Sequence, residues 1–303
     1  MTQTDIEPVE GFLHQVLFYC LQPVLLVVVI AYWYLDPTRE ESYLLALIFV
    51  QLVLGFFEQC FPARPAWSVS AKERIRNLAL VVVLTMSALA VTDLYHVWLS
   101  GPLEAARQSI GLDIWPRNWP LLVQLFMVFF LSELLWYWMH RAEHRWNLIW
   151  RLSAHGSHHS FKKIGALNFG LNHPVEYFFI VLPSFLVELV FGVGTAALGA
   201  AMLTVTQASI AHTNTVSNTR WIGLLFTTSK YHICHHSAAL KESNTNYGCS
   251  AIIWDRLFGT FLDKTIDEAG TGPTEPTLWE KFLMPFKEPE DTTIAPGTSK
   301  IGI

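Results

Sequence analysis

The chain has 303 residues, of which 52% are hydrophobic and only 15% are charged, and its formal net charge is −5. An average soluble domain carries roughly 25% charged residues, so this composition, together with a positive mean hydropathy, is typical of a membrane protein. A nucleic-acid-binding protein usually gathers Lys and Arg into a basic surface. The small and dispersed charge excludes that class, and we expect no nucleic-acid partner.

Apolar segments follow one another along the chain. Four of them approach the ~20 residues that a helix needs to cross a bilayer, at about 12–35, 43–60, 78–99 and 120–139. The region 175–211 is long enough for two more helices, with a turn near Gly192 and Gly194. Pro183 could instead break the first of these two. We predict an all-α, polytopic membrane bundle with six crossings, and four crossings as the alternative.

Lys and Arg side chains concentrate in three segments between or after the predicted crossings. They are Arg64, Lys72, Arg74 and Arg76; Arg141, Arg145, Arg151, Lys162 and Lys163; and Arg220, Lys230, Lys241 and Arg256. With six crossings, all three segments and both termini fall on one side of the membrane. Because loops rich in Lys and Arg remain in the cytoplasm, we predict that this side is cytoplasmic.

Histidines form the strongest local pattern. Ten of the twelve lie between residues 140 and 236: His140 and His144 in HRAEH; His155, His158 and His159 in HGSHH; His173 in NHPVE; His212 in AHTNT; and His232, His235 and His236 in HICHH. The pattern HxxHH occurs twice, and on a helix it sets positions i, i+3 and i+4 along one stripe. Each cluster can therefore direct two or three imidazoles at one point. His14 and His96 stand apart, and we expect neither to be a ligand.

Such clustering predicts a metal centre. Neutral imidazole suits iron, zinc, copper or nickel better than magnesium or calcium. Ten ligands exceed the positions around one octahedral ion, so a centre with two ions is the simplest interpretation. A zinc hydrolase usually carries an HExxH motif, which the sequence lacks, and a metal transporter would spread its histidines through several crossings. These two alternatives are therefore less favoured.

Several stretches also resemble a known family. They are ELLWYWMHRAEHRWNLIWRLSAHGSHHS, NHPVEY, HTN, and YHICHHS followed by NYGCSAIIWDRLFGT. Over about 133–263 they are similar to the integral-membrane fatty acid hydroxylase/sterol desaturase superfamily of histidine-box, non-haem diiron oxygenases. The resemblance does not extend to the first hundred residues.

The resemblance implies two iron ions on the cytoplasmic face, in a histidine-rich helical cap above the membrane helices. The implied ligands are His140, His144, His155, His158, His159, His173, His212, His232, His235 and His236. The implied activity is O2-dependent hydroxylation of an unactivated C–H bond in a membrane lipid or sterol-like substrate, with desaturation as the alternative. Because the sequence contains no haem or flavin motif, we expect a separate reductase chain to supply electrons.

Glu133 shares a helical face with His140 and His144. An ionisable side chain at membrane depth is a functional candidate by default, and we expect Glu133 to orient His140 or another imidazole in the catalytic centre. A salt bridge to Arg141 or Arg145 is the structural alternative.

The composition divides the chain into three parts. We expect membrane helices over 1–119, the hydroxylase-like catalytic domain over 120–263, and a loose tail over 264–303, which is rich in Pro, Gly, Thr and Glu. Within that tail, the stretch 277–286 is expected to lie along the membrane surface.

Overall fold

The computed structural model describes residues 11–216 and 221–286. The long helices are α1 (Phe12–Leu35), α2 (Ser42–Cys60), α3 (Ala71–Ser109), α4 (Leu121–Arg145), α7 (Tyr177–Phe191) and α8 (Ala196–His212). The short ones are η1 (Pro65–Trp67), α5 (Asn147–Ser153), α6 (His155–His158), η2 (Ala166–Gly170), η3 (Pro174–Glu176), η4 (Ile222–Leu224), α9 (Ser229–His235), α10 (Leu240–Ser243), α11 (Ile253–Phe258) and α12 (Leu278–Leu283). In the described ranges β pairing is limited to one bridge between Ser237 and Ala269. The all-α prediction is confirmed.

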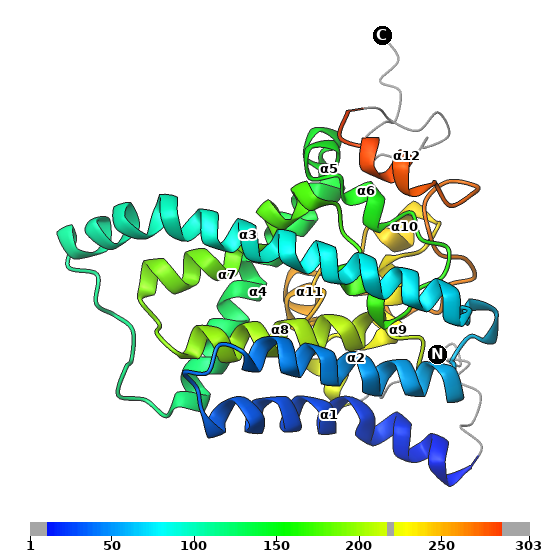
Figure 1. Cartoon of the computed structure of the whole chain (residues 1–303), viewed down its shortest axis with the longest axis horizontal. Helices are drawn as coiled ribbons and strands as arrows, with labels where there is room; N and C mark the ends of the chain where they lie inside the picture. The colour runs from blue at the N-terminus through cyan, green and yellow to red at the C-terminus, as the bar shows by residue number, and fades with distance from the viewer. Residues whose placement is uncertain (1–10, 217–220, 287–303) are drawn as a thin grey trace.

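The long helices form a bundle with α8 inside it. Helices α1, α2, α3, α7 and α8 run along the longest axis, and α4 crosses them at an angle (Figure 1). Helix α8 packs against α1, α2 and α4, while α3 packs against α7. The short helices α5, α6, α9, α10 and α12 gather beside one end of the bundle. We call the described residues 146–173 and 221–286 the histidine cap.

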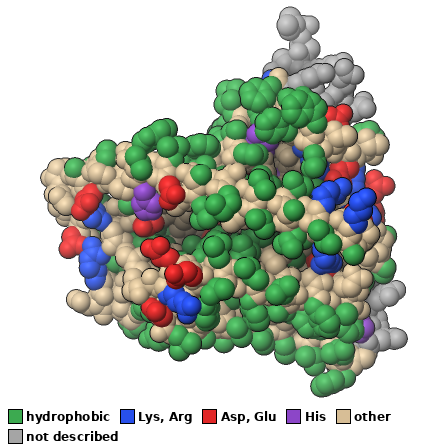
Figure 2. All heavy atoms as spheres, viewed as in Figure 1, with side chains coloured by type: hydrophobic (Ala, Val, Ile, Leu, Met, Phe, Trp, Pro, Cys, Tyr) green, Lys and Arg blue, Asp and Glu red, His purple; other side chains and the backbone are tan. Residues whose placement is uncertain are grey.

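Five segments of the described chain are long and apolar enough to cross a membrane. They are α1, α2, α3, α4 and the segment Pro174–Phe191, which joins η3 to α7. Apolar side chains such as Leu52 and Val83 point outward from them, and charged groups gather toward the two ends of the visible face (Figure 2). These features indicate a multi-pass membrane protein. The chain does turn near Gly192 and Gly194, but α8 has only 17 residues, so the count of six crossings stays a prediction.

Helix α8 approaches its neighbours closely because its residues are small. A Cβ atom on Gly199 would lie only 2.5 Å from Trp33 Cε2 and 2.6 Å from Leu125 Cδ1. Small residues allow such close packing between membrane helices. Both large partners are completely buried, so α8 is fixed by shape against α1 and α4.

Polar side chains set the position of α8 along the bundle. Gln22 Nε2 of α1 donates to Gln207 Oε1 at 3.0 Å, and both glutamines donate to the backbone carbonyl of Thr227. Gln51 Nε2 of α2 donates to Ser209 Oγ at 2.9 Å. An unsatisfied polar group is costly in a membrane interior, so sliding of α8 past α1 or α2 would break these bonds at a high cost.

Glu58, near the end of α2, holds the chain just beyond α8. Its Oε1 accepts hydrogen bonds from the backbone N–H groups of Ala166 at 2.6 Å and Asn214 at 2.9 Å, and from the hydroxyl of Thr213 at 3.1 Å. Its Oε2 lies 3.5 Å from Arg74 Nη1. The last residue of α8, His212, is thereby fixed next to the cap.

The basic segment between α2 and α3 lies at the same end of the molecule. Arg64 N–H donates to Asn214 Oδ1 at 2.9 Å, and Arg64 Nη2 contacts the carbonyl of Ile266. This segment therefore borders the histidine cap, as six crossings require. Arg220 and both termini lie outside the described residues, and the cytoplasmic orientation stays a prediction.

Residues 264–286 are folded against the cap. Thr271 N–H donates to the carbonyl of His159 at 2.8 Å, and Gly270 N–H donates to that of His236 at 2.9 Å. Helix α12 begins with a capping box between Thr277 and Glu280. The described start of the expected loose tail is thus ordered, while 287–303 lies outside the described residues. The three-part division and the membrane-surface position of 277–286 stay predictions.

Candidate metal centre

Nine histidines form two buried groups. The first group is His140 and His144 of α4, His155 and His159 in and after α6, and His235 of α9. The second is His158 of α6, His212 at the end of α8, and His232 and His236 in and after α9. Within each group the ligand nitrogens lie within 4.8 Å of one another. The three histidine boxes and His212 are therefore brought together as the sequence predicts.

Each HxxHH motif divides between the two groups instead of pointing at one place. His155 and His159 enter the first group while His158 enters the second; in α9, His235 enters the first and its neighbours the second. A helix turns about 100° per residue, so positions i+3 and i+4 diverge by that angle. One short helix can thus supply ligands to two adjacent ions, and two imidazoles of each motif still meet in one group.

The spacing of the ring nitrogens matches ligation of a common ion. Nε2 of His140 lies 2.9 Å from Nε2 of His155 and 3.0 Å from that of His235. In the second group, His212 Nε2 lies 3.1 Å from His158 Nε2 and 3.0 Å from His232 Nε2. Two adjacent imidazoles bound at right angles to a metal at roughly 2.1 Å would place their nitrogens about 3.0 Å apart.

Hydrogen bonding on the opposite ring edge shows that the Nε2 atoms of His140 and His235 carry lone pairs. His140 Nδ1 lies 2.6 Å from the carbonyl of Tyr247, and His235 Nδ1 lies 2.7 Å from that of Thr245. A carbonyl only accepts, so each Nδ1 must carry the proton. The two neutral rings then face each other with bare Nε2 atoms, which cannot hydrogen-bond to one another. A cation between them satisfies both, so the donor set fits a bound metal.

Burial keeps the imidazoles in the form that binds metal. Desolvation, with smaller contributions from neighbouring imidazoles, lowers the pKa of His158, His159 and His236 well below its usual value. The same causes lower the pKa of His232 and His235. Neutral imidazole is the ligand form, so the rings are ready to bind a metal ion near neutral pH.

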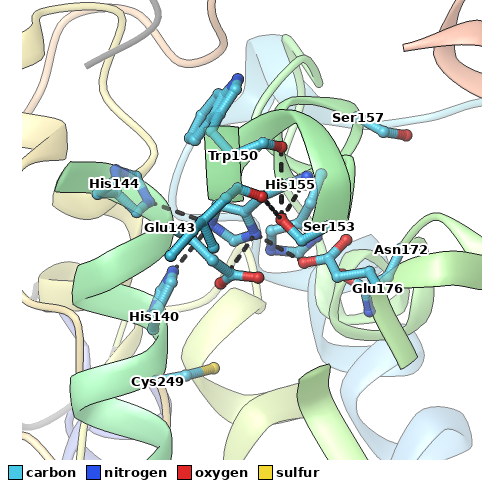
Figure 3. A network of polar contacts seen from close by, with 12 residues as sticks. His140, Glu143, His144, Trp150, Ser153, His155, Ser157, Asn172, Glu176 and Cys249 are labelled. Carbon is cyan, nitrogen blue, oxygen red and sulfur yellow. Dashed lines mark hydrogen bonds and ion pairs between the residues drawn. The ribbon is translucent and has the colours of Figure 1, made fainter. Parts of the chain in front are cut away.

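Two glutamates that sequence reasoning missed lie beside His155 (Figure 3). His155 Nδ1 is 2.6 Å from Oε1 of Glu176 and 3.8 Å from Oε2 of Glu143. Both carboxyl groups are fully buried. Glu143 lies inside HRAEH and Glu176 inside NHPVE, but only the fold shows that both face the same imidazole.

His173 does not join either group. Its Nδ1 accepts a hydrogen bond from Val175 N–H at 3.2 Å, which caps η3, and its Nε2 lies 3.1 Å from the carbonyl of Phe282. Both ring nitrogens are engaged with backbone groups. The structure therefore corrects the interpretation of His173 as a ligand: it tethers α12 to η3.

Glu133 of α4 is buried against α8. Its Oε1 accepts a hydrogen bond from Thr204 Oγ1 at 3.3 Å, and Ser250 lies next to it. Cys249, the residue before Ser250, places its Sγ 3.7 Å from His232 Nε2. No contact of Glu133 with an imidazole is seen among the described residues, so its role in orienting one stays a proposal.

Asp255 holds the loop that carries one of the carbonyl acceptors. Its two oxygens accept from Tyr247 N–H at 2.8 Å and Gly248 N–H at 2.7 Å, and Thr260 Oγ1 donates at 2.7 Å. The Tyr247 carbonyl is thereby aimed at His140. Burial raises the pKa of Asp255 to about 6.

Comparison with known proteins agrees with this geometry. Residues 125–260 match the family model described as fatty acid hydroxylase. Ornithine lipid hydroxylase OlsE of Rhizobium tropici is 28% identical over 271 residues, which cover 82% of this chain and 78% of the relative. Alkylglycerol monooxygenase of Danio rerio is 25% identical over 78% of this chain and 50% of its own length, and the Homo sapiens protein is 28% identical over 42% and 28%. The match thus spans half or less of those monooxygenases. No solved structure matches the chain.

A helical membrane bundle that carries two groups of buried imidazoles defines a class of metal-dependent membrane enzymes. Within that class, the family match and the relatives support the membrane fatty acid hydroxylase superfamily. The named relatives are hydroxylases and monooxygenases, which supports an oxidoreductase of that family. The resemblance read from the histidine boxes is confirmed.

Proposed function

We propose that the chain is an O2-dependent diiron hydroxylase that inserts one oxygen atom into an unactivated C–H bond of a membrane lipid. The observation that carries the proposal is the pair of histidine groups, in which Nε2 atoms face each other about 3 Å apart, those of His140 and His235 without protons. The substrate C–H becomes C–OH, the second oxygen atom leaves as water, and two electrons and two protons are consumed. Bound iron would supply O2 activation and electron storage.

Each group of residues has a distinct task in this proposal. The five- and four-histidine groups would each hold one ion. The Tyr247 and Thr245 carbonyls fix the ring orientations of His140 and His235, because the partner of the second nitrogen sets the tautomer of a ligand. Glu133 provides a buried polar group where α4 enters the membrane. The lipid would reach the centre from the bilayer.

The names of the relatives narrow the choice of candidate lipid substrates. One relative is named for ornithine lipids and the others for alkylglycerols, so an aminolipid and an ether lipid are the two substrates to offer first. We also propose a separate reductase chain as the electron source. Desaturation at the same centre would remove two hydrogens without adding oxygen, and mass spectrometry distinguishes the two products.

The test is oxidation of defined lipids in membranes that contain the chain. Vesicles carrying ornithine lipid or alkylglycerol are supplied with isotopically labelled O2 and a reducing system, and the masses of the lipid products are measured by mass spectrometry. The proposal expects one labelled oxygen atom per product molecule and about two irons per chain. His235→Ala should abolish product formation and lower the iron content of the protein. A chain that retains zinc after iron-replete growth and oxidises neither lipid would overturn the proposal.

A further inference from the structure

The two histidine groups differ in what lies behind them. In the first group, the Nδ1 atoms of His140, His155 and His235 have acceptors at 2.6–2.7 Å. In the second, the Nδ1 atoms of His232 and His236 are buried without a hydrogen-bond partner among the described residues. The rings of the first group are therefore the more firmly oriented.

Of the acceptors in the first group, only that of His155 is a carboxyl group. Glu176 Oε1 is 2.6 Å from Nδ1, a short distance for a nitrogen donor. A carboxylate that accepts this proton makes the imidazole a stronger electron donor to its metal. In the second group, His212 Nδ1 faces only the backbone carbonyl of Ala208, at 2.8 Å.

Glu143 reinforces the same imidazole from another helix. Ser153 lies beside it, but its hydroxyl donates to the carbonyl of Ile149 at 2.9 Å. Both oxygens of Glu143 and the second oxygen of Glu176 therefore lack a hydrogen-bond donor among the described residues. Two fully buried acids beside a single ring are costly without a compensating positive charge. A cation bound through His155 Nε2 would supply that charge.

We infer that Glu143 and Glu176 are positioning residues that act through His155 and make the five-histidine site the tighter of two unequal metal sites. Helix α4 contributes Glu143 and η3 contributes Glu176, so the pair forms only when these two segments come together. The four-histidine site, which has weaker support behind its rings, holds its ion less firmly. This inference rests on the metal binding in the proposed function and goes beyond it by ranking the sites.

The experiment is a chelator titration of detergent-purified full-length protein loaded with iron-57, followed by Mössbauer spectroscopy. The native protein should lose one ion first and keep the other. Glu176→Gln preserves the side-chain shape but removes the carboxylate. It should lower the affinity of the protein for the retained ion by about 10- to 100-fold. The two ions should then leave together or in the reverse order. The subspectrum of that ion alone should change.

Two further variants keep the result interpretable. Glu143→Gln removes no hydrogen bond made in the described structure, so the variant should fold. It should lower the affinity for the same ion by a smaller factor. Glu188→Gln is the matched control on α7. Glu188 lies twelve residues after Glu176, which is about 18 Å along a helix at 1.5 Å per residue, so the affinities for both ions should be unchanged. Each variant is first checked for native elution and melting.

The outcomes separate this inference from the proposed function. Unchanged affinities and unchanged subspectra in both Glu176→Gln and Glu143→Gln would overturn the positioning role. If the native protein binds zinc in place of iron, the oxygenase proposal fails. The order of zinc release would still test the inequality of the two sites, because the same Gln variants must then release the tighter zinc earlier.

Discussion

The membrane bundle and the histidine cap are ordered by different forces. In the bundle, large apolar side chains such as Trp33, Leu125 and Phe129 fill the interior. In the cap, the helices are short and many buried side chains are polar, among them Asn246 and Asp255. The bundle is thus held by shape, and the cap by hydrogen bonds and by whatever its imidazoles bind. The two regions should fail under different perturbations.

Metal removal should have the largest effect and should be confined to the cap. A structural zinc site contributes roughly 10–16 kcal/mol of apparent binding free energy in small domains, and without a cation the Nε2 lone pairs of His140 and His235 face each other. Exhaustive chelation should therefore make the cap sensitive to protease. Helicity measured by circular dichroism should fall only slightly, because the bundle remains. Loss of most helicity on chelation would contradict the division into two regions.

Replacing single histidines should come next. His158→Ala and His235→Ala each remove a ligand from a different group, and turnover should fall by more than about 100-fold, since even groups that only orient a ligand cost 10- to 100-fold. Membrane insertion should be unaffected. His96→Ala, on α3 outside both groups, is the control. A fully active double variant would refute the ligand assignment.

Overpacking the bundle should destabilise the protein by a smaller amount, and this time in the bundle and not in the cap. In Gly199→Ala, the new Cβ would collide with Trp33 and Leu125, at a cost of about 1–3 kcal/mol. Gly101→Ala on α3 meets no atom within 4 Å and should be neutral or slightly stabilising. Thermal melting in detergent compares the two. Equal melting temperatures would show that α8 can shift away from its neighbours.

An effect of similar size is expected at Asn246, which braces the cap. Its amide donates to the carbonyls of Tyr231 and Leu262, and its Oδ1 accepts from Leu262 N–H. Its φ is 54°, which suits Asn or Gly. Asn246→Ala should cost roughly 2–3 kcal/mol of cap stability, and Asn246→Gly about 1 kcal/mol less. Protease sensitivity of the cap measures both. If Gly is no better than Ala, backbone strain plays no part.

Sequence reasoning succeeds where a pattern is local. Hydrophobic length predicts the candidate membrane helices, and histidine spacing singles out nine side chains that the fold gathers into two groups. It fails where long-range contacts decide. His173 has the local context of a ligand, but η3 turns its ring toward Phe282. Glu176 stands three residues later in the same motif, and only the approach of α4 to η3 brings it to His155. Glu133 lies on the predicted face, yet its described contacts lie with Thr204 and Ser250.

The central position of α8 has a consequence for how the protein is made. The helix is short, and Gln207 pairs with Gln22 of α1 while Ser209 accepts a hydrogen bond from Gln51 of α2. On its own in a bilayer, α8 would leave the side chain of Gln207 without this partner. We therefore expect α8 to take its place only after α1 and α2 have come together. His212 arrives with it, so the proposed four-histidine site cannot be completed before the bundle has closed.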